Sequence, residues 1–263
     1  ELEGLFFDTS DFDLKDKVVG EGTFGKVFLA QNNSDDQLYA AKVINCGDNI
    51  EQCKKVAARE VSIMLQVKHP TIVKFFGYSL VDFYGENNVT IIMEYATNKS
   101  LADVLEMIQK NNGPKYYNNT SRQIILLGVA RGMMYLHDKN IIHRDLKPGN
   151  ILLNDEFHPL ITDFGFSKSF EVGHSFSQSQ ACGTLTYMAP EILDNRKYDR
   201  KVDVYAFAIL MFEVVTDTVS YPDLFNKKIK EYTFPHRVIN DKYRPQFIYP
   251  TKHEFKKLIE LCW

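Results

Sequence analysis

The stretch IIHRDLKPGNILL at residues 141–153 brings several chemically capable side chains into one short turn. A carboxylate, an ammonium, a guanidinium and a carboxamide lie there between two apolar runs that have strand character. Burying such a turn costs free energy unless each polar group is paired or bound to a ligand. The turn therefore indicates a site for a charged ligand. Its polar residues are His143, Arg144, Asp145, Lys147 and Asn150.

A glycine-rich run, GEGTFG at residues 20–25, is a second candidate site. Glycines let the backbone approach phosphate oxygens and offer N–H groups to them, although a plain glycine hairpin has the same composition. In dinucleotide-binding folds the third glycine opens a helix. Here Gly25 is followed by KVFLA, which has strand character, so a flap between two antiparallel strands is favoured over a dinucleotide site.

The elements that must position these residues differ between the two parts of the chain. The first part reads as strands around one helix, which is predicted between about Ile50 and Val67 from apolar residues at helical spacing and is ended by KHP. The expected strands are DLKDKVVGEG, KVFLAQ, LYAAKVI, IVKFFGYSL and VTIIMEYA.

After Ala96 the pattern becomes mostly helical. SLADVLEMIQK is amphipathic, and Thr120 with Gln123 has the form of a capping box that opens a long helix to about His137. RKVDVYAFAILMFEVVT is so apolar that, as a helix, it must be buried nearly all round. The change of composition near Ala96 predicts a boundary between two lobes.

Composition excludes several classes of protein. The net charge of −3 gives no general basic surface, so neither nucleic acid nor an anionic membrane is expected as the main partner. No apolar run approaches the roughly 18 residues needed to span a bilayer, and the first residues lack a secretion signal pattern. The cysteines have neither metal-site nor disulfide-framework spacing, which favours a reduced, cytoplasmic setting. They are Cys46, Cys53, Cys182 and Cys262.

Five short motifs follow one another in the chain: GEGTFG with Val27, Ala40-Ala41-Lys42, His143-Arg144-Asp145 with Asn150, Asp163-Phe164-Gly165, and Ala189-Pro190-Glu191. This ordered set resembles the eukaryotic protein kinase family. The resemblance implies an α+β, two-lobed fold, with a small antiparallel β lobe that carries one main helix and a larger, mostly helical lobe. It implies a kinase domain over residues 13–263, split into an N-lobe at about 13–95 and a C-lobe at 96–263, after an N-terminal extension at residues 1–12.

The resemblance also implies roles for the charged residues. Asp145 would be the base that accepts or orients the proton of a substrate hydroxyl, and Lys147 would steady the transferred phosphate. Lys42 would hold the α- and β-phosphates while paired with a helix glutamate, for which Glu60 is the match. His143 and Phe164 are expected to be structural residues packed beneath Met64.

The implied cofactors are ATP and Mg²⁺. Asn150 and Asp163 resemble the metal ligands, since Mg²⁺ prefers oxygen donors. Met93 matches the residue at the back of the adenine pocket, and backbone groups of residues 94–96 would pair with adenine. The other expected nucleotide contacts are Val19, Gly20, Gly22, Gly25, Val27, Ala40, Lys42, Glu94, Ala96 and Leu152.

Lys147 and the segment Cys182-Gly183-Thr184 resemble serine/threonine kinases, which implies transfer of the γ-phosphate of ATP to Ser/Thr hydroxyls of protein substrates. The segments DVYAFAILMFEVVT and FKKLIELCW resemble the tyrosine-kinase-like branch of that group. Three alternatives stay open: a pseudokinase that acts as a scaffold, a kinase of tyrosine or dual specificity, and a nucleotide-binding enzyme that is not a kinase.

Arg144 beside Asp145 suggests control by an upstream activating kinase, because a phosphate on the segment between residues 163 and 191 could pair with its guanidinium. The candidate phosphate acceptors are Ser175, Ser177 and Ser179, whereas Thr184 is expected to be structural. In the family Glu191 pairs with a later arginine, and Trp263 comes before that arginine would arrive. The C-terminal end of the lobe is therefore expected to be incomplete.

Overall fold

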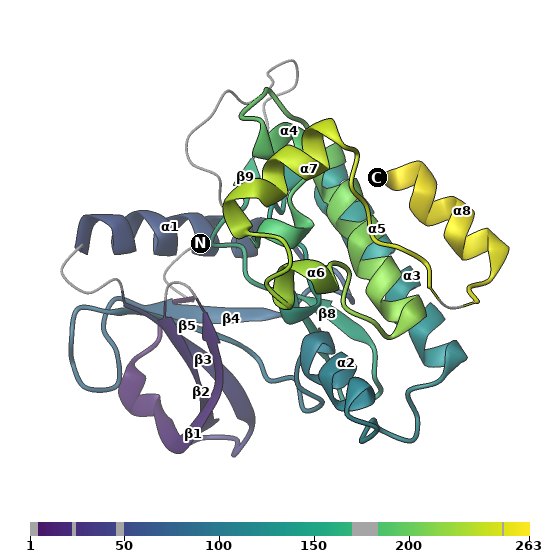
Figure 1. Cartoon of the computed structure of the whole chain (residues 1–263). Helices are drawn as coiled ribbons and strands as arrows, with labels where there is room; N and C mark the ends of the chain where they lie inside the picture. The colour runs from purple at the N-terminus through teal and green to yellow at the C-terminus, as the bar shows by residue number, and fades with distance from the viewer. Residues whose placement is uncertain (1–4, 23–24, 46–49, 170–183, 249) are drawn as a thin grey trace.

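The computed structural model describes residues 5–22, 25–45, 50–169, 184–248 and 250–263. Figure 1 shows two lobes, a twisted sheet with one long helix and a larger bundle of helices. This is the α+β, two-lobed arrangement expected from the sequence, so that expectation is confirmed. No helix in the described part of the chain has both the length and the apolar composition needed to cross a membrane.

The N-terminal lobe is a five-stranded antiparallel sheet in the order β1-β2-β3-β5-β4. Its strands are β1 (Phe12–Gly22), β2 (Gly25–Asn32), β3 (Leu38–Ile44), β4 (Phe75–Ser79) and β5 (Val89–Glu94). Helix α1 (Ile50–Gln66) contacts β4 and β5. Every strand and the helix predicted for this lobe are present, although β4 is shorter than the apolar run that predicted it.

The glycine run forms the flap expected from its sequence. Gly22 pairs with Gly25, and Gly20 pairs with Val27, where β1 turns into β2. Gly25 has a φ of 152°, and a Cβ added to it would lie 1.9 Å from the carbonyl oxygen of Val43 on β3. Only glycine fits this approach of β2 to β3, so Gly25 holds the flap to the sheet.

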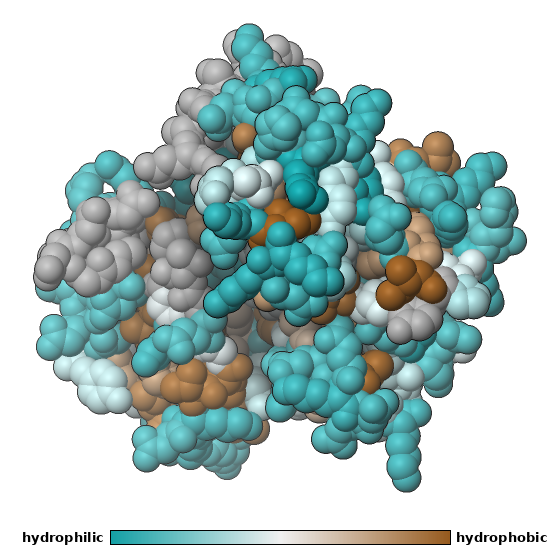
Figure 2. All heavy atoms as spheres, viewed as in Figure 1, coloured by the Kyte–Doolittle hydropathy of each residue, from teal (hydrophilic) through white to brown (hydrophobic). Residues whose placement is uncertain are grey.

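The C-terminal lobe consists mainly of helices. They are α2 (Leu101–Gln109), α3 (Asn119–Asp138), α4 (Pro190–Leu193), α5 (Lys201–Thr216), α6 (Pro222–Phe225), α7 (Phe234–Asn240) and α8 (His253–Cys262). Helix α5 is buried along most of its length, as its composition predicted. The surface of the face shown in Figure 2 is largely hydrophilic, with hydrophobic residues in scattered areas.

Four short strands frame the polar turn of residues 143–150: β6 (Ile141–Ile142), β7 (Ile151–Leu153), β8 (Pro159–Ile161) and β9 (Lys168–Ser169). β6 pairs with β9, and β7 pairs with β8. The 3₁₀ turn η3 (Pro148–Asn150) leads directly into β7. The two apolar runs at either end of the turn are therefore strands, and they fix both of its ends.

The predicted capping box of α3 is wrong. The helix begins at Asn119, and its N-cap is Asn118, whose side-chain oxygen accepts from the N–H groups of Thr120 and Ser121. Ser121 Oγ accepts in return from the N–H of Asn118. Asn118 satisfies two free N–H groups at once, so it caps the helix and leaves Thr120 inside the first turn.

One buried hydrophobic cluster extends through both lobes. It includes Met64 of α1, Met93 of β5, Phe164 and Phe212 of α5. Phe164 is fully buried, and its ring centroid lies 5.5 Å from that of His143. Both side chains are thus packed inside the molecule, as expected for structural residues.

Candidate active site

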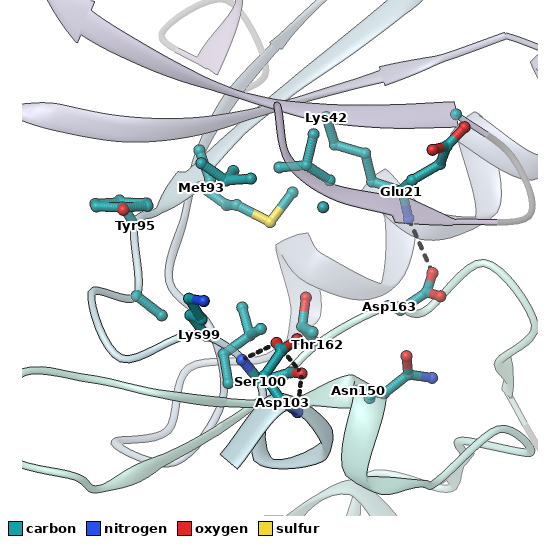
Figure 3. Close-up of a pocket in the computed structure, with 18 residues that line it drawn as sticks. Glu21, Lys42, Met93, Tyr95, Lys99, Ser100, Asp103, Asn150, Thr162 and Asp163 are labelled. Atoms are coloured by element: carbon teal, nitrogen blue, oxygen red, sulfur yellow. Dashed lines mark hydrogen bonds and ion pairs between the residues drawn. The ribbon is translucent and has the colours of Figure 1, made fainter. Parts of the chain in front are cut away.

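Three charged side chains from three separate elements meet between the lobes. Lys42 on β3 donates to both carboxylate oxygens of Glu60 on α1, at 2.7 and 2.8 Å. The same Nζ lies 2.8 Å from Oδ1 of Asp163. Figure 3 shows Lys42 pointing down from the sheet toward Asp163 in the other lobe. The three residues thus connect the sheet, its helix and the C-terminal lobe.

Burial and charge act in opposite directions on these three groups. Burial disfavours the ammonium of Lys42, but the carboxylates of Glu60 and Asp163 outweigh burial and raise the pKa of Lys42. Burial would raise the pKa of Asp163, but the Lys42 ammonium outweighs it and lowers that pKa. Burial raises the pKa of Glu60 in spite of Lys42. At neutral pH Lys42 is therefore charged and Asp163 is ionised.

Asp145 lies in the polar turn with both carboxylate oxygens in use. Its Oδ1 accepts from the N–H of Thr184 at 3.0 Å, and its Oδ2 lies 2.8 Å from Nζ of Lys147. Lys147 also donates to Oγ1 of Thr184 at 2.8 Å. The carboxylate of Asp145 is only 2% exposed, so these contacts fix its orientation. Thr184 acts as a structural partner of the turn, as expected.

Asn150 is turned so that its amide nitrogen faces Asp145. Its Nδ2 donates to the backbone oxygen of Asp145 at 2.7 Å and to Oδ2 at 2.9 Å. The amide oxygen is left on the other side, and Figure 3 shows it directed upward, toward Asp163. The described residues include no group of three or more His, Cys, Asp or Glu that could hold a metal ion. The oxygens of Asn150 and Asp163 fit a cation that takes few protein ligands and completes its shell with phosphate and water, as Mg²⁺ does.

Asp203 near the start of α5 holds the turn, and our reading of the sequence missed it. Its carboxylate accepts from the backbone N–H groups of His143 and Arg144, each at 2.9 Å. It also lies 2.8 Å from Nε2 of His137 on α3. Asp203 is 1% exposed, and an acidic residue within a mostly apolar helix was the clue that the sequence offered.

Two residues of the site have left-handed backbone conformations: Arg144 has a φ of 68° and Asp163 a φ of 66°. A left-handed non-glycine residue is uncommon and costs free energy unless its surroundings hold it. Bonds to Asp203 hold the first position, and the ion pair with Lys42 holds the side chain of the second. The backbone is therefore constrained where the charged groups converge.

A pocket of about 380 Å³ lies between the lobes beside these residues. Figure 3 shows Met93 and Tyr95 at one end of it, and Lys42, Asp163 and Asn150 at the other. The sequence-predicted residues that line the pocket are Val19, Gly20, Gly25, Val27, Ala40, Lys42, Met93, Ala96, Asn150, Leu152 and Asp163. One end is thus apolar and the other is charged, which suits a ligand with a flat base and an anionic tail.

One predicted contact, Glu94, does not line the pocket. Glu94 directs its carboxylate to the N–H of Lys74 at 3.2 Å, and its own N–H donates to the oxygen of Lys74 at 2.9 Å. Gly22 lies at the tip of the flap, where it pairs with Gly25. Lys74, just before β4, therefore occupies the N–H of Glu94, one of the backbone groups of residues 94–96 that were expected to pair with adenine.

The structure adds pocket residues that the sequence reading missed: Glu21, Lys99, Ser100, Asp103, Gly149 and Thr162. Tyr95, within the stretch 94–96 expected to contact adenine, also lines the pocket. Ser100 and Asp103 form the capping box of α2, with the serine hydroxyl donating to the carboxylate at 2.5 Å. A Ser-x-x-Asp pattern at the start of a predicted helix could have identified both residues as its cap. Nothing in the pattern alone shows that this helix end faces the pocket.

Residues 14–263 match the family described as "Protein kinase domain", and the chain belongs to this family. It is 34% identical over 207 residues to "Serine/threonine-protein kinase Aurora-2" of Arabidopsis thaliana, which covers 78% of this chain and 68% of that protein. It is 33% identical over 225 residues to "Aurora kinase" of Saccharomyces cerevisiae, with 85% and 57% covered. It is 34% identical over 257 residues to "Ribosomal protein S6 kinase alpha-3" of Mus musculus, with 96% and 32% covered. The chain thus spans about a third to two thirds of the length of these relatives.

These relatives support the serine/threonine group but not the tyrosine-kinase-like branch, so the finer resemblance is without support. The two segments that suggested this branch, DVYAFAILMFEVVT and FKKLIELCW, form parts of α5 and α8. Apolar packing helices carry little information about the branch of a family, because many sequences satisfy the same burial.

The expected regulatory contacts are only partly visible. Ser175, Ser177 and Ser179 lie outside the described residues. The guanidinium of Arg144 donates to the backbone oxygen of Phe166 at 2.6 Å and to the hydroxyl of Tyr198 at 2.9 Å. No residue in the described part of the chain forms an ion pair with Glu191. Phosphate binding by Arg144 stays a prediction.

Proposed function

We propose that the chain is an ATP- and Mg²⁺-dependent kinase that phosphorylates Ser and Thr hydroxyls of protein substrates. The observation that carries this proposal is that Lys42 and Asp163, from elements far apart in the sequence, pair in one pocket. Asp145 is held next to that pocket by Asn150, which lines it. Phosphoryl transfer requires mainly positioning and charge stabilisation from the protein. A pocket with a fixed ammonium, a fixed carboxylate and free oxygen ligands provides these.

In this proposal Asp145 accepts or orients the proton of the substrate hydroxyl. Its contacts with Asn150, Lys147 and the N–H of Thr184 keep the carboxylate aimed in one direction. Positioned proton transfer of this kind contributes roughly 10²- to 10⁴-fold to rate.

Lys42 would hold the phosphates of the nucleotide, and Glu60 would keep its ammonium directed into the pocket. Asn150 and Asp163 would hold Mg²⁺, which when bound neutralises charge on the phosphates. Lys147 would steady the phosphate that is transferred, because its Nζ lies between Asp145 and Thr184. The apolar end of the pocket, with Val27, would take the adenine ring.

The preference for short hydroxyls is supported by the contact between Lys147 and Thr184. This contact joins the polar turn to the segment before η4 (Leu185–Tyr187). The matched relatives named serine/threonine kinases agree with it. We further propose that an upstream kinase activates the protein and that it acts in the cytoplasm.

The test compares the wild type with Asp145→Asn in the transfer of radiolabelled phosphate from ATP to a generic protein substrate. We expect the variant to lose most transfer while it still binds an ATP analogue, because Asn has nearly the same shape but accepts no proton. Asp138→Asn, at the exposed end of α3, is the matched control and should transfer normally. Equal incorporation by wild type and Asp145→Asn would refute the catalytic assignment.

The same experiment separates an enzyme from a pseudokinase scaffold. A scaffold would bind the analogue and transfer no phosphate in any variant. Residues that match the family's nucleotide, metal and base positions are all present in the sequence, and Asp145 is bonded to Asn150 of the pocket, which favours the enzyme.

A further inference from the structure

The sheet has an edge strand, β4, that is covered by the chain's own N-terminal segment. This segment, residues 5–12, leads into β1, of which Phe12 is the first residue, and lies outside the matched family region. Phe6 forms a parallel bridge with Tyr78, and the N–H of Phe7 donates to the oxygen of Tyr78 at 3.3 Å. An exposed edge strand offers free N–H and C=O groups, and an added strand satisfies them.

The fit of the segment depends on a glycine in β4. Gly77 is buried, and a Cβ added to it would lie 2.5 Å from the carbonyl oxygen of Leu5 and 3.3 Å from Cδ1 of Phe7. The backbone of residues 5–7 therefore passes so close to β4 that no larger residue fits at position 77. A segment that merely lay on the surface would not need this approach.

Aromatic rings continue the contact into the sheet. The ring of Phe7 lies 5.2 Å from that of Phe12, which lies 5.6 Å from Tyr39, and Tyr39 lies 4.9 Å from Phe76 of β4. All these pairs are edge-to-face, an arrangement worth about 0.5–1.5 kcal/mol per pair beyond burial. The segment is thus held through its side chains as well as its backbone.

The other face of β4 packs toward α1. The ring of Phe6 lies 6.0 Å from that of Tyr78, and Tyr78 packs against the cluster that contains Val61 and Met64 of α1. Leu5 shares a groove of about 820 Å³ with Met64 and with residues 67–75. A continuous path of packed side chains therefore leads from the segment through β4 to the helix that carries Glu60.

We propose that residues 5–12 form a positioning strap, which closes the edge of β4 and thereby holds α1 where Glu60 pairs with Lys42. This inference rests on the proposed function, because it concerns control of the nucleotide pocket. The residues of the strap touch neither Lys42 nor Glu60, so they act through β4 and α1. Release of the strap, for example by a partner that binds it, lowers the fraction of molecules with the ion pair formed.

The strap is tested with Gly77→Ala and Phe7→Ala, which weaken it from its two sides. If residues 5–12 did not pack against Gly77, Gly77→Ala should leave the stability of the protein unchanged or raise it slightly, since glycine is unfavourable within a strand. Leu80→Ala is the matched control, because Leu80 follows β4, is 60% exposed and lies away from the strap contacts. Amide hydrogen exchange is measured along the chain, and the Kd of a non-hydrolysable ATP analogue with Mg²⁺ is measured well below the unfolding temperature.

We expect both strap variants to exchange faster in residues 5–12 and also in α1 around Glu60, and Leu80→Ala to behave as the wild type. If the competent fraction falls to about a third, the Kd of the analogue rises about threefold. Faster exchange confined to residues 5–12, with an unchanged Kd, would overturn the proposal and leave the segment a local addition. If the wild type itself does not bind the analogue, the proposed function fails, and exchange in α1 alone decides the strap.

Discussion

Lys42 neutralises two carboxylates at once, so its removal should affect stability separately from chemistry. In Lys42→Met, Glu60 stays buried without an oppositely charged partner, and breaking a buried pair in this way costs about 3–5 kcal/mol. The double variant Lys42→Met with Glu60→Gln removes that buried charge. We expect it to recover most of the lost unfolding free energy but no phosphate transfer, as measured by urea unfolding and by the radiolabel assay.

The pH dependence of this pair of variants follows from the sign of the shift. Burial holds the pKa of Glu60 above its ordinary value of 4.5, and loss of the ammonium raises it further. A raised folded pKa adds stability below the unfolded value, which is lost as pH rises through the folded pKa. Relative to the double variant, Lys42→Met should therefore lose stability as pH rises from about 4.5. Parallel pH profiles of the two variants would show that Glu60 is not the buried charge responsible.

For individual residues, the sequence predicted the charged residues of the site better than the residues that position them. Lys42, Asp145 and Asp163 belong to short motifs whose order is specific. Lys42 and Asp163 line one pocket, and Asp145 is bonded to Asn150 of the same pocket. Asp203 and Asp103 belong to helices, where a single acidic residue is common for many reasons. Their importance arises from contacts with residues about 60 positions away or with the pocket, which no local pattern records.

Helix α3 packs closely against β8 because Gly128 has no side chain at the contact. A Cβ at Gly128 would lie 2.5 Å from Cγ of Pro159, at the start of β8, and 3.4 Å from Cγ2 of Thr71. β8 pairs with β7, which follows Asn150, so the close approach of α3 supports the polar turn.

We expect Gly128→Ala to destabilise the protein by about 1–3 kcal/mol through overpacking. In an open helix position the same change would stabilise by roughly 1 kcal/mol, because alanine has the higher helix propensity. Thermal unfolding of the variant measures the sign. A higher unfolding temperature would mean that α3 moves freely away from β8.

Helices and strands were predicted well where the hydrophobic pattern is long. Helix starts were predicted poorly where several polar residues could each be the N-cap. The long apolar run of α5 predicted a buried helix, and β3 is apolar apart from Lys42. The start of α3 contains Asn118, Thr120 and Ser121, each able to cap a helix, and the choice depends on which side chain reaches two N–H groups. The division of the chain at residues 95 and 96 stays a prediction.

In the whole molecule, the ligand pocket lies between two lobes, so ligand binding should stabilise both together. An ATP analogue with Mg²⁺ at about 100 times its Kd should add about 2.7 kcal/mol to the unfolding free energy. Chelation of Mg²⁺ should remove part of this gain in the wild type but little of it in Asp163→Asn, since that variant lacks a metal oxygen ligand. An identical gain with and without Mg²⁺ in the wild type would exclude Asp163 as a ligand.

The contact between Lys42 and Asp163, 2.8 Å long, makes the pocket sensitive to competition between anions. A phosphate that approaches the ammonium must share it with a carboxylate that is already there. As the phosphate attracts the ammonium of Lys42 more strongly, the ion pair of Lys42 with Asp163 weakens. Asp163 has a left-handed backbone conformation that depends on such contacts. Phosphate binding at Lys42 therefore changes the conformational restraint on the residues that follow Asp163, although these residues do not contact the phosphate.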